Sequence, residues 1–406
     1  MTERGVIMLQ IEEAQAMLTE QVRKIEQTER VSLADALGRV LAEDVTAERD
    51  QPPFPRSPLD GYAVRAADVA GASKENPAVL HVIGRIYAGY VFDGIVGEGQ
   101  AVRLMTGAPI PEGADAIIRQ EDTFAENDTV QIYVSSEPYQ NYCFQGEDYK
   151  AGTVLLPKDS RLDAGKITVL SSLGKTEAVV YRKPSVAVIS TGDEVLVPGQ
   201  PWSPGKIYDS NRAYICARLT EAGNPPVISM HAADEARKVA DEIRKAAQQA
   251  DFVITTGGVS VGEKDILHDV VKLLDAEQLF WKVRIKPGSP TLAFVCEGTL
   301  VLCLSGNPFG AIANFELLAR PVLAALTGQK DWLLPMENAV LQNDFRKPAG
   351  ARRFLRGCLE NGKVYINGKM QSSGAIASMV ECNCLVEIRP DMAGAMAGET
   401  VQVYRL

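Results

Sequence analysis

The chain has 406 residues, of which 46% are hydrophobic and 23% are charged, an ordinary globular mixture without the signature of disorder. A chain of this length exceeds a single hydrophobic core, so we expect about two to four domains. The formal net charge of −10 argues against a general nucleic-acid-binding protein, because such proteins need a positive surface to displace counterions. A small anionic substrate is compatible with this net charge, since a few lysines can bind such a substrate locally.

Cysteine and histidine usage argues against a structural zinc site. The chain has seven cysteines but only three histidines, and no two cysteines form a CxxC pair. The odd number of cysteines, without a recognisable signal peptide, predicts reduced thiols in the cytoplasm. No stretch reaches the ~18 apolar residues needed to cross a bilayer, so we expect no membrane association.

The N-terminal half shows helical spacing first and short alternating runs later. Apolar residues recur at helical spacing over 8–27, and a second, shorter helix is predicted over 31–45. Four prolines between residues 52 and 58 then prevent regular hydrogen bonding and leave an extended, pre-ordered segment. Short alternating runs over 76–142 predict a small β domain, and 143–180 is a further mixed segment.

From Pro184 onward, continuous apolar runs alternate with helical segments. Strands are predicted at 185–190, 226–230, 251–258 and 299–306, with helices at 211–222, 234–249, 264–274 and 309–326. This alternation predicts parallel strands with crossover connections, an α/β domain of three layers. After Gln329 the chain returns to short alternating segments, which predict a second small β domain. The fold class is therefore α/β plus β.

Ligands of such sheets collect beyond the carboxyl ends of the strands, and three strand ends here carry TGDE, TTGG and SGNP. Gly257 and Gly258 permit backbone amides to approach an anion at a helix start, although a tight turn without a ligand is the alternative. The following Glu-Lys-Asp at 263–265 adds a carboxylate. Two like charges ~4 Å apart cost about 4 kcal/mol at an effective dielectric near 20, so phosphate and carboxylate together suggest magnesium between them.

For the other candidate residues, a purely structural role is the alternative to a functional one. Of the adjacent Asp193 and Glu194, only one is expected to face a cleft, and a solvated turn is the alternative. Asp234 follows the second strand, where capping the next helix is the commonest role. Asp60 follows the proline-rich segment, which could present it on a preorganised turn or simply form an ordinary Asp-Gly turn.

A basic segment precedes the last α/β strand. Lys282, Arg284 and Lys286 are expected on one side of an extended run, where they could hold a tetrahedral oxyanion and a phosphate. Alternatively, they only discourage strand pairing.

Seven runs together resemble the molybdopterin molybdenumtransferase family, whose animal member is the E domain of gephyrin. They occur in the family's order: SPLDGYA (57–63), MTGAPIPEGADAIIRQED (105–122), GEDYKAG (146–152), STGDEV (190–195), TTGGVSVGEKD (255–265), FWKVRIKPGSP (280–290) and SGNPFGA (305–311). The resemblance implies a homodimer of four-domain subunits. We expect a discontinuous domain (1–50 and 143–181), an inserted small β domain (51–142), the α/β molybdopterin-binding domain (182–329) and a C-terminal β barrel (330–406).

The resemblance also implies an activity. In such enzymes adenylylated molybdopterin binds, molybdate enters the dithiolene with the help of Mg²⁺, and AMP leaves. The catalytic acids then correspond to Asp60, Asp148, Glu194, Asp234 and Asp265, of which Glu194, Asp234 and Asp265 would hold the metal. Substrate binding corresponds to Thr106, Gly257, Gly258, Ser260, Lys282, Lys286, Gly306, Asn307 and Pro308. Molybdopterin adenylyltransferase and molybdoenzymes are the possible partners, with neither nucleic acid nor membrane.

The sequence departs from the family pattern at the same cleft. Ser289 stands where a lysine is usual, Ser305 replaces a proline, and Phe309-Gly310 follows where valine and serine are typical. Loss of one cation could weaken molybdate binding or change which oxyanion is preferred. A related adenylyltransferase is disfavoured by the extra N-terminal and C-terminal domains. A non-catalytic paralogue that binds molybdopterin or a partner protein as a carrier or scaffold is the remaining alternative.

Overall fold

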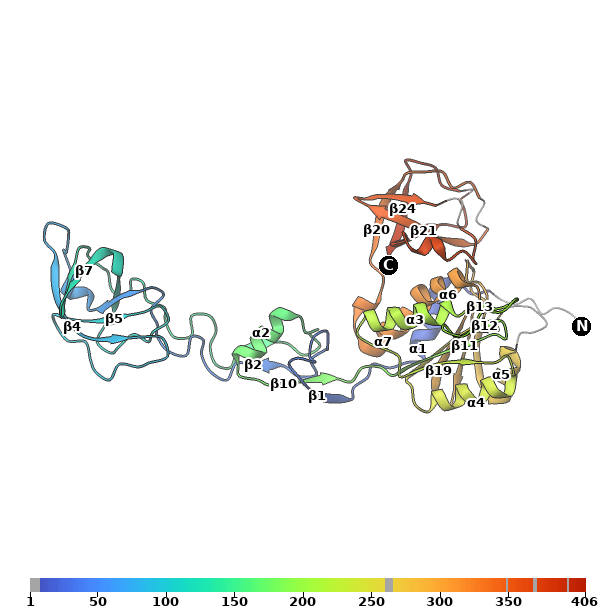
Figure 1. Ribbon diagram of the computed structural model, residues 1–406, viewed down its shortest axis with the longest axis horizontal. Helices are drawn as coiled ribbons and strands as arrows, with labels where there is room; N and C mark the ends of the chain where they lie inside the picture. Colours follow the sequence, from blue (N-terminus) through green and yellow to red (C-terminus); the bar gives the residue numbers. More distant parts are fainter. Residues whose placement is uncertain (1–7, 260–265, 348–349, 368–370, 393) are drawn as a thin grey trace, which may run out of the picture. The chain divides into compact units, whose positions relative to one another are not determined.

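The computed structural model of the protein describes residues 8–259, 266–347, 350–367, 371–392 and 394–406. The chain forms two compact units (Figure 1). Residues 1–29 and 181–406 make up the first unit, and residues 30–180 make up the second. The two units are described separately below.

The second unit contains the small β structure expected from the alternating runs. Its six-stranded sheet has the order β6-β3-β5-β4-β8-β7. The strands are β3 (Gly61–Val64), β4 (Ala78–Ile86), β5 (Gln100–Leu104), β6 (Ala116–Arg119), β7 (Thr123–Glu126) and β8 (Thr129–Ile132). Alternate residues of β3 enter different cores, because Tyr62 and Val64 pack in one apolar cluster and Ala63 in another. Both faces of this central strand are therefore buried.

The predicted helix over 31–45 is wrong. The segment runs from β1 (Thr28–Ser32) through turns to β2 (Val45–Thr46), which pairs with β9 (Val154–Leu156). Its backbone bonds to distant residues instead of to itself: the Gly38 and Leu41 amides donate to Leu162 and Ser160 at 2.8 and 2.9 Å. Gly38 also has a φ of 75°, a left-handed conformation that a helix cannot contain.

The one α-helix found among the described residues of the second unit is α2 (Ala164–Ser172). Asp163 caps it, since its carboxylate accepts a hydrogen bond from the Lys166 amide. After α2 the chain continues into β10 (Glu177–Tyr181).

The first unit is built on a six-stranded sheet of order β14-β11-β15-β19-β18-β16. The first four strands are parallel, as predicted, and the last two are antiparallel. The parallel strands are β11 (Val186–Thr191), β14 (Ile228–Ala232), β15 (Phe252–Thr256) and β19 (Thr299–Leu304); β16 (Glu277–Trp281) and β18 (Leu292–Cys296) complete the sheet.

Helices cover both faces of this sheet (Figure 1). One face packs against α1 (Ile11–Glu20), α3 (Ser210–Glu221), α6 (Pro308–Asn314) and α7 (Arg320–Thr327), and the other against α4 (Ala236–Ala247) and α5 (Leu267–Leu274). Neighbouring residues of β11 point to opposite layers: Val186 and Val188 join the first cluster, and Ala187 and Ile189 the second. The three-layer α/β prediction is confirmed.

The stretch Pro308–Thr327 is long and apolar enough to cross a membrane, but 83% of its most apolar window is buried inside the protein. It contains a π-helical turn, η3 (Phe315–Ala319), between α6 and α7. Burial and a polar interior cluster identify it as a core helix. Glu316, which is fully buried, accepts hydrogen bonds from Tyr214 and Arg218, each at 2.8 Å, and pairs with Arg320 at 3.5 Å.

The C-terminal residues form the barrel that the resemblance implied. Its strands are β20 (Met336–Leu341), β21 (Arg352–Glu360), β22 (Lys363–Ile366), β23 (Cys384–Ile388) and β24 (Thr400–Arg405). The order β21-β22-β20-β24-β23 closes because β23 also pairs with β21. The short strand β17 (Ile285–Lys286) lies parallel to β21 at the outside of this ring.

The buried charge of Glu316 provides a test of the first unit. The Glu316→Gln variant leaves buried Arg320 without the carboxylate that it pairs with and leaves Arg218 paired with the exposed Glu221, so we expect a loss of about 3 kcal/mol. All three tryptophans lie in this unit, and urea unfolding followed by their fluorescence measures it. The control Glu221→Gln removes only the exposed partner of Arg218 and should cost under about 1 kcal/mol. Equal losses in the two variants would contradict this account.

Candidate active site at the strand ends

The carboxyl ends of three adjacent strands approach one another closely, and at Gly257 they leave no room for a side chain. A Cβ on Gly257, which follows β15, would lie 2.4 Å from the carbonyl oxygen of Thr191 at the end of β11. A Cβ on Gly306, after β19, would contact the Gly257 Cα at 3.4 Å. Gly257 also has a φ of 103°, which glycine adopts without strain. The predicted convergence of these loops is confirmed, and glycine makes it possible.

Two acids from neighbouring strand ends lie against each other. The Asp193 amide donates to the Asp234 carboxylate at 3.3 Å, and the Asp234 amide donates to the Asp193 carboxylate at 3.2 Å. This reciprocal pair joins the loops that follow β11 and β14. Two carboxylates therefore share one small region, and the nearby Lys206 ammonium donates to the Asp193 carbonyl oxygen at 2.5 Å.

Asp234 is in an unfavourable environment for a carboxylate. Its Oδ1 is buried and makes no hydrogen bond of good geometry, and the same is true of the neighbouring Thr191 hydroxyl, although the Thr191 side chain lowers the pKa of Asp234. Burial, followed by the negative charges of Asp193 and Glu194, raises the pKa of Asp234. A buried oxygen without a partner between like charges fits a bound cation, because a cation would satisfy the oxygen and relieve the repulsion.

The position of Asp234 excludes the alternative that this residue caps the following helix. The residue that caps α4 is Glu235, whose side chain makes no capping hydrogen bond, so Asp234 is not the helix cap. Glu194 is exposed and contributes its charge to the Asp234 environment. Asp193 lies against Asp234; the residue pattern left open which of the two acids faces the cleft, and the resemblance implied Glu194.

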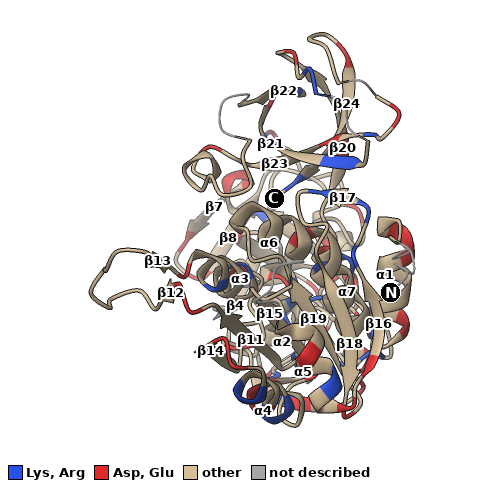
Figure 2. Ribbon diagram, turned by 90° about the vertical axis from the view of Figure 1, so that its right-hand side faces the viewer, with Lys and Arg blue, Asp and Glu red and all other residues tan. Residues whose placement is uncertain are grey.

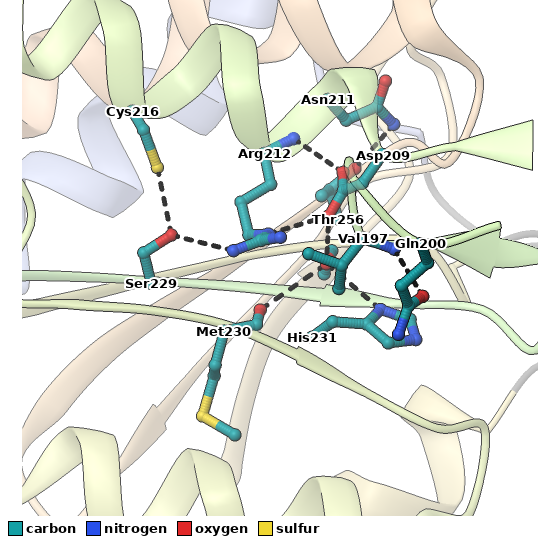
Figure 3. A network of polar contacts seen from close by, with 11 residues as sticks. Val197, Gln200, Asp209, Asn211, Arg212, Cys216, Ser229, Met230, His231 and Thr256 are labelled. Atoms are coloured by element: carbon teal, nitrogen blue, oxygen red, sulfur yellow. Dashed lines mark hydrogen bonds and ion pairs between the residues drawn. The ribbon is translucent and has the colours of Figure 1, made fainter.

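A buried polar network joins these strand ends to the start of α3 (Figure 3). The Ser190 hydroxyl donates to Asp209 at 2.6 Å and lies 3.2 Å from His231 Nδ1, which links β11 to β14. Asp209 also pairs with Arg212 at 2.8 Å and caps α3 by accepting the Arg212 amide at 3.0 Å. Periodicity alone gives no signal for this support.

The same network reaches the loop after β19. The Asn211 amide group donates to the Thr256 hydroxyl and to the Gly306 carbonyl, both at 2.9 Å. Pro308 is the first residue of α6 and Asn307 its N-cap. The Asn307 side chain does not cap α6. Pro308 has no N–H to donate, and the Phe309 amide donates to the Ser373 carbonyl at 2.9 Å.

The basic segment is not one extended run. β16 ends at Trp281 and β17 contains only Ile285–Lys286, while Lys282 has a φ of 76°. The left-handed backbone at Lys282 interrupts the alternation, so the prediction that three cations share one face is wrong at this residue. The Lys282 ammonium lies 4.0 Å over the Trp281 ring. Exposed Lys286 lies beside β21 of the barrel.

The second unit brings two further candidates together. One Asp60 carboxylate oxygen accepts hydrogen bonds from the Thr106 amide at 2.7 Å and from its hydroxyl at 2.8 Å. These bonds lower the pKa of Asp60, so it is a carboxylate at neutral pH. Gly61 begins β3, so the Asp-Gly turn alternative is wrong. Asp148 is exposed, and its amide donates to Gln51.

Some candidates lie outside the described residues, namely Ser260 and Asp265 with the rest of 260–265. Within the described ranges, no three acidic, thiol or imidazole side chains are grouped so as to hold a metal ion. Magnesium commonly takes only one or two carboxylates and completes its coordination with substrate phosphates and water. The Asp193–Asp234 pair suits that arrangement.

The crowded acids predict a variant that gains stability. Because the folded protein raises the pKa of Asp234, its ionised form destabilises the fold above that pKa, and this penalty vanishes as the pH falls below the unfolded value. Asp234→Asn should therefore raise the melting temperature at pH 7 by on the order of 2 °C. Calorimetry at pH 7 and pH 4 measures the difference, which should shrink at pH 4. A lower melting temperature at pH 7 would show that the carboxylate stabilises the fold.

Comparison with known proteins agrees with this geometry over the whole chain. Residues 9–174 match the MoeA N-terminal region (domain I and II), 187–325 match the probable molybdopterin binding domain, and 338–406 match the MoeA C-terminal region (domain IV). A solved molybdopterin biosynthesis MoeA protein from Pyrococcus horikosii is similar at a TM-score of 0.86 and 33% identity, covering 98% of this chain and 99% of that one.

Curated relatives give the same result. The molybdopterin molybdenumtransferase of Bacillus subtilis (strain 168) is 39% identical over 390 residues, which are 93% of this chain and 89% of the relative. A protein of the same name from Staphylococcus epidermidis is 38% identical over 376 residues, 92% of this chain and 90% of the relative. The chain thus belongs to the molybdopterin molybdenumtransferase family and is a transferase of molybdenum cofactor biosynthesis.

Proposed function

We propose that the protein inserts molybdate into adenylylated molybdopterin, with magnesium-dependent release of AMP. The observation that carries the proposal is the Asp193–Asp234 pair, in which a buried carboxylate oxygen has no partner among the described residues. Such an oxygen beside glycine loops at the ends of parallel strands suits a cation shared with substrate phosphates. Magnesium, when bound there, would neutralise the phosphoanhydride and stabilise the departing AMP.

The strand-end loops would hold the substrate phosphates. Gly257 and Gly258 have left-handed backbones, which leave main-chain amides accessible to an anion. Gly306, Asn307 and Pro308, in the loop after β19, would contact the same substrate. We propose Asp234 as a metal ligand together with Glu194 and Asp265, and we add Asp193, which lies against Asp234.

The remaining candidates would act on molybdate and on the reacting end of the substrate. Lys282 and Lys286 would neutralise the oxyanion, Lys286 as an exposed cation and Lys282 from its fixed position over Trp281. Asp60 is held as a carboxylate by Thr106, so it can accept hydrogen bonds from the substrate. We propose a catalytic role for Asp148 as well.

The cellular compartment, oligomeric state and partners that we propose for the enzyme follow from the same family resemblance. We propose a cytoplasmic homodimer whose partners are a molybdopterin adenylyltransferase, which supplies the substrate, and molybdoenzymes, which receive the product. All seven cysteines are free, which suits a reducing compartment. We propose the domain limits 1–50 with 143–181, 51–142, 182–329 and 330–406; the separate six-stranded sheets and the closed barrel support them.

AMP release tests the activity directly. Purified protein supplied with adenylylated molybdopterin, magnesium and increasing molybdate should release AMP in a saturable manner, and Asp234→Asn should lower the rate by at least about 100-fold. The control Asp241→Asn removes an exposed acid of α4, the helix that follows Asp234; Asp241 pairs at the surface with Arg244, and this variant should keep the wild-type rate. Substrate binding without AMP release at any molybdate concentration would favour a carrier instead.

Lys286 tests the molybdate site separately. Lys286→Gln removes an exposed cation, so the molybdate concentration for half-maximal AMP release should rise about tenfold. Added salt should weaken this difference because the interaction is electrostatic. Lys245→Gln, a control at a surface pair with Glu242, should leave half-saturation unchanged. An unchanged molybdate response in Lys286→Gln would remove Lys286 from the proposed site.

A further inference from the structure

One buried side-chain amide lies between two of the proposed substrate loops. Asn314, at the end of α6, is fully buried. Its Oδ1 accepts a hydrogen bond from the Ser305 amide at 3.1 Å, and its Nδ2 donates to the Gly288 carbonyl at 2.9 Å. Ser305 precedes the loop with Asn307 and Pro308, and Gly288 follows Lys286 by two residues.

The residue at 305 decides whether this bridge can form. Ser305 has a backbone N–H to donate, whereas the proline usual at this position has none. With proline there, the buried Oδ1 of Asn314 would lose its donor, which is costly in the interior. The Ser305 hydroxyl accepts the Asn307 amide at 3.3 Å, so serine also contacts the substrate loop directly.

Two glycines leave the space that this arrangement needs. A Cβ on Gly310 would lie 2.7 Å from the Ser305 Oγ and 2.9 Å from its Cβ. A Cβ on Gly288 would lie 2.6 Å from Asn314 Nδ2. Both distances are shorter than real contacts of a Cβ. Glycine at 310 thus leaves room for the Ser305 hydroxyl, and glycine at 288 leaves room for the amide of Asn314.

We propose that Asn314 is a positioning residue that fixes the loop of Asn307 and Pro308 relative to the turn after Lys286. Ser305 and Gly310 form a matched pair with it, so the two departures from the family pattern compensate each other. This inference rests on the proposed function for its kinetic consequence. Its geometric part is independent of the activity.

The hydrogen bonds of Asn314 hold only one side of the loop that contains Asn307 and Pro308. On the other side, the Thr256 hydroxyl donates to the Ser305 carbonyl at 3.1 Å and Asn211 donates to Gly306. The Gly288 carbonyl keeps a second donor, the Thr291 hydroxyl at 2.7 Å. Losing Asn314 should therefore shift the two loops relative to each other without unfolding the sheet.

The first experiment compares Asn314→Leu with Val322→Ala in AMP release and in ADP binding by calorimetry. Val322 is buried in the same helical segment and controls for lost stability. We expect Asn314→Leu to raise the KM for adenylylated molybdopterin about tenfold and to weaken ADP binding similarly, with a smaller change in kcat. Val322→Ala should lower the melting temperature but leave KM and ADP affinity near wild type.

The second experiment is a steric rescue. Gly310→Ala should weaken ADP binding about tenfold because its methyl group collides with Ser305, and Ser305→Gly in the same chain should restore most of the loss. Wild-type ADP affinity in both Asn314→Leu and Gly310→Ala, or no rescue in the double variant, would overturn the inference. Wild-type protein that binds ADP with these dependences but releases no AMP would instead overturn the proposed function.

Discussion

The close approach of Thr191, Gly257 and Gly306 at the ends of β11, β15 and β19 is the constraint on which the site depends. A methyl group on Gly257 would lie 2.4 Å from a backbone oxygen, so these loops can meet only through glycine. Their meeting places the glycine loops at the carboxyl edge of the sheet, where the ligands of such sheets collect. The apolar strands below, buried on both faces, keep the three ends in register.

The acidic side chains at these strand ends lower the stability of the folded protein. Asp193 and Asp234 bond to each other's amides, and the pKa of Asp234 is raised by its burial and by its acidic neighbours. A fold that retains such repulsion is less stable than it could be, as is common at functional sites. Figure 2 shows the acidic and basic residues over the first unit, with the loop between β12 (Val195–Leu196) and β13 (Ile207–Tyr208) extending beyond the sheet.

Much of the α/β fold could be predicted because its strands are continuous apolar runs separated by helical spacing. The helix predicted over 31–45 was wrong because spacing cannot reveal that Gly38 and Leu41 bond to residues more than a hundred positions away. Motifs located Asp234 and the glycine loops. They could not show that Asp193 lies against Asp234, or that the Asn314 amide group joins two loops, because tertiary contacts set the directions of these side chains.

The central claim is that the strand-end acids bind a divalent cation shared with a phosphoanhydride. Mn²⁺ binding, followed by electron paramagnetic resonance with and without ADP, tests it in the wild type and in Asp193→Asn and Asp234→Asn. The account predicts that ADP tightens Mn²⁺ binding in the wild type and that either substitution removes this effect. Equal Mn²⁺ affinity in all three proteins, with or without ADP, would contradict it.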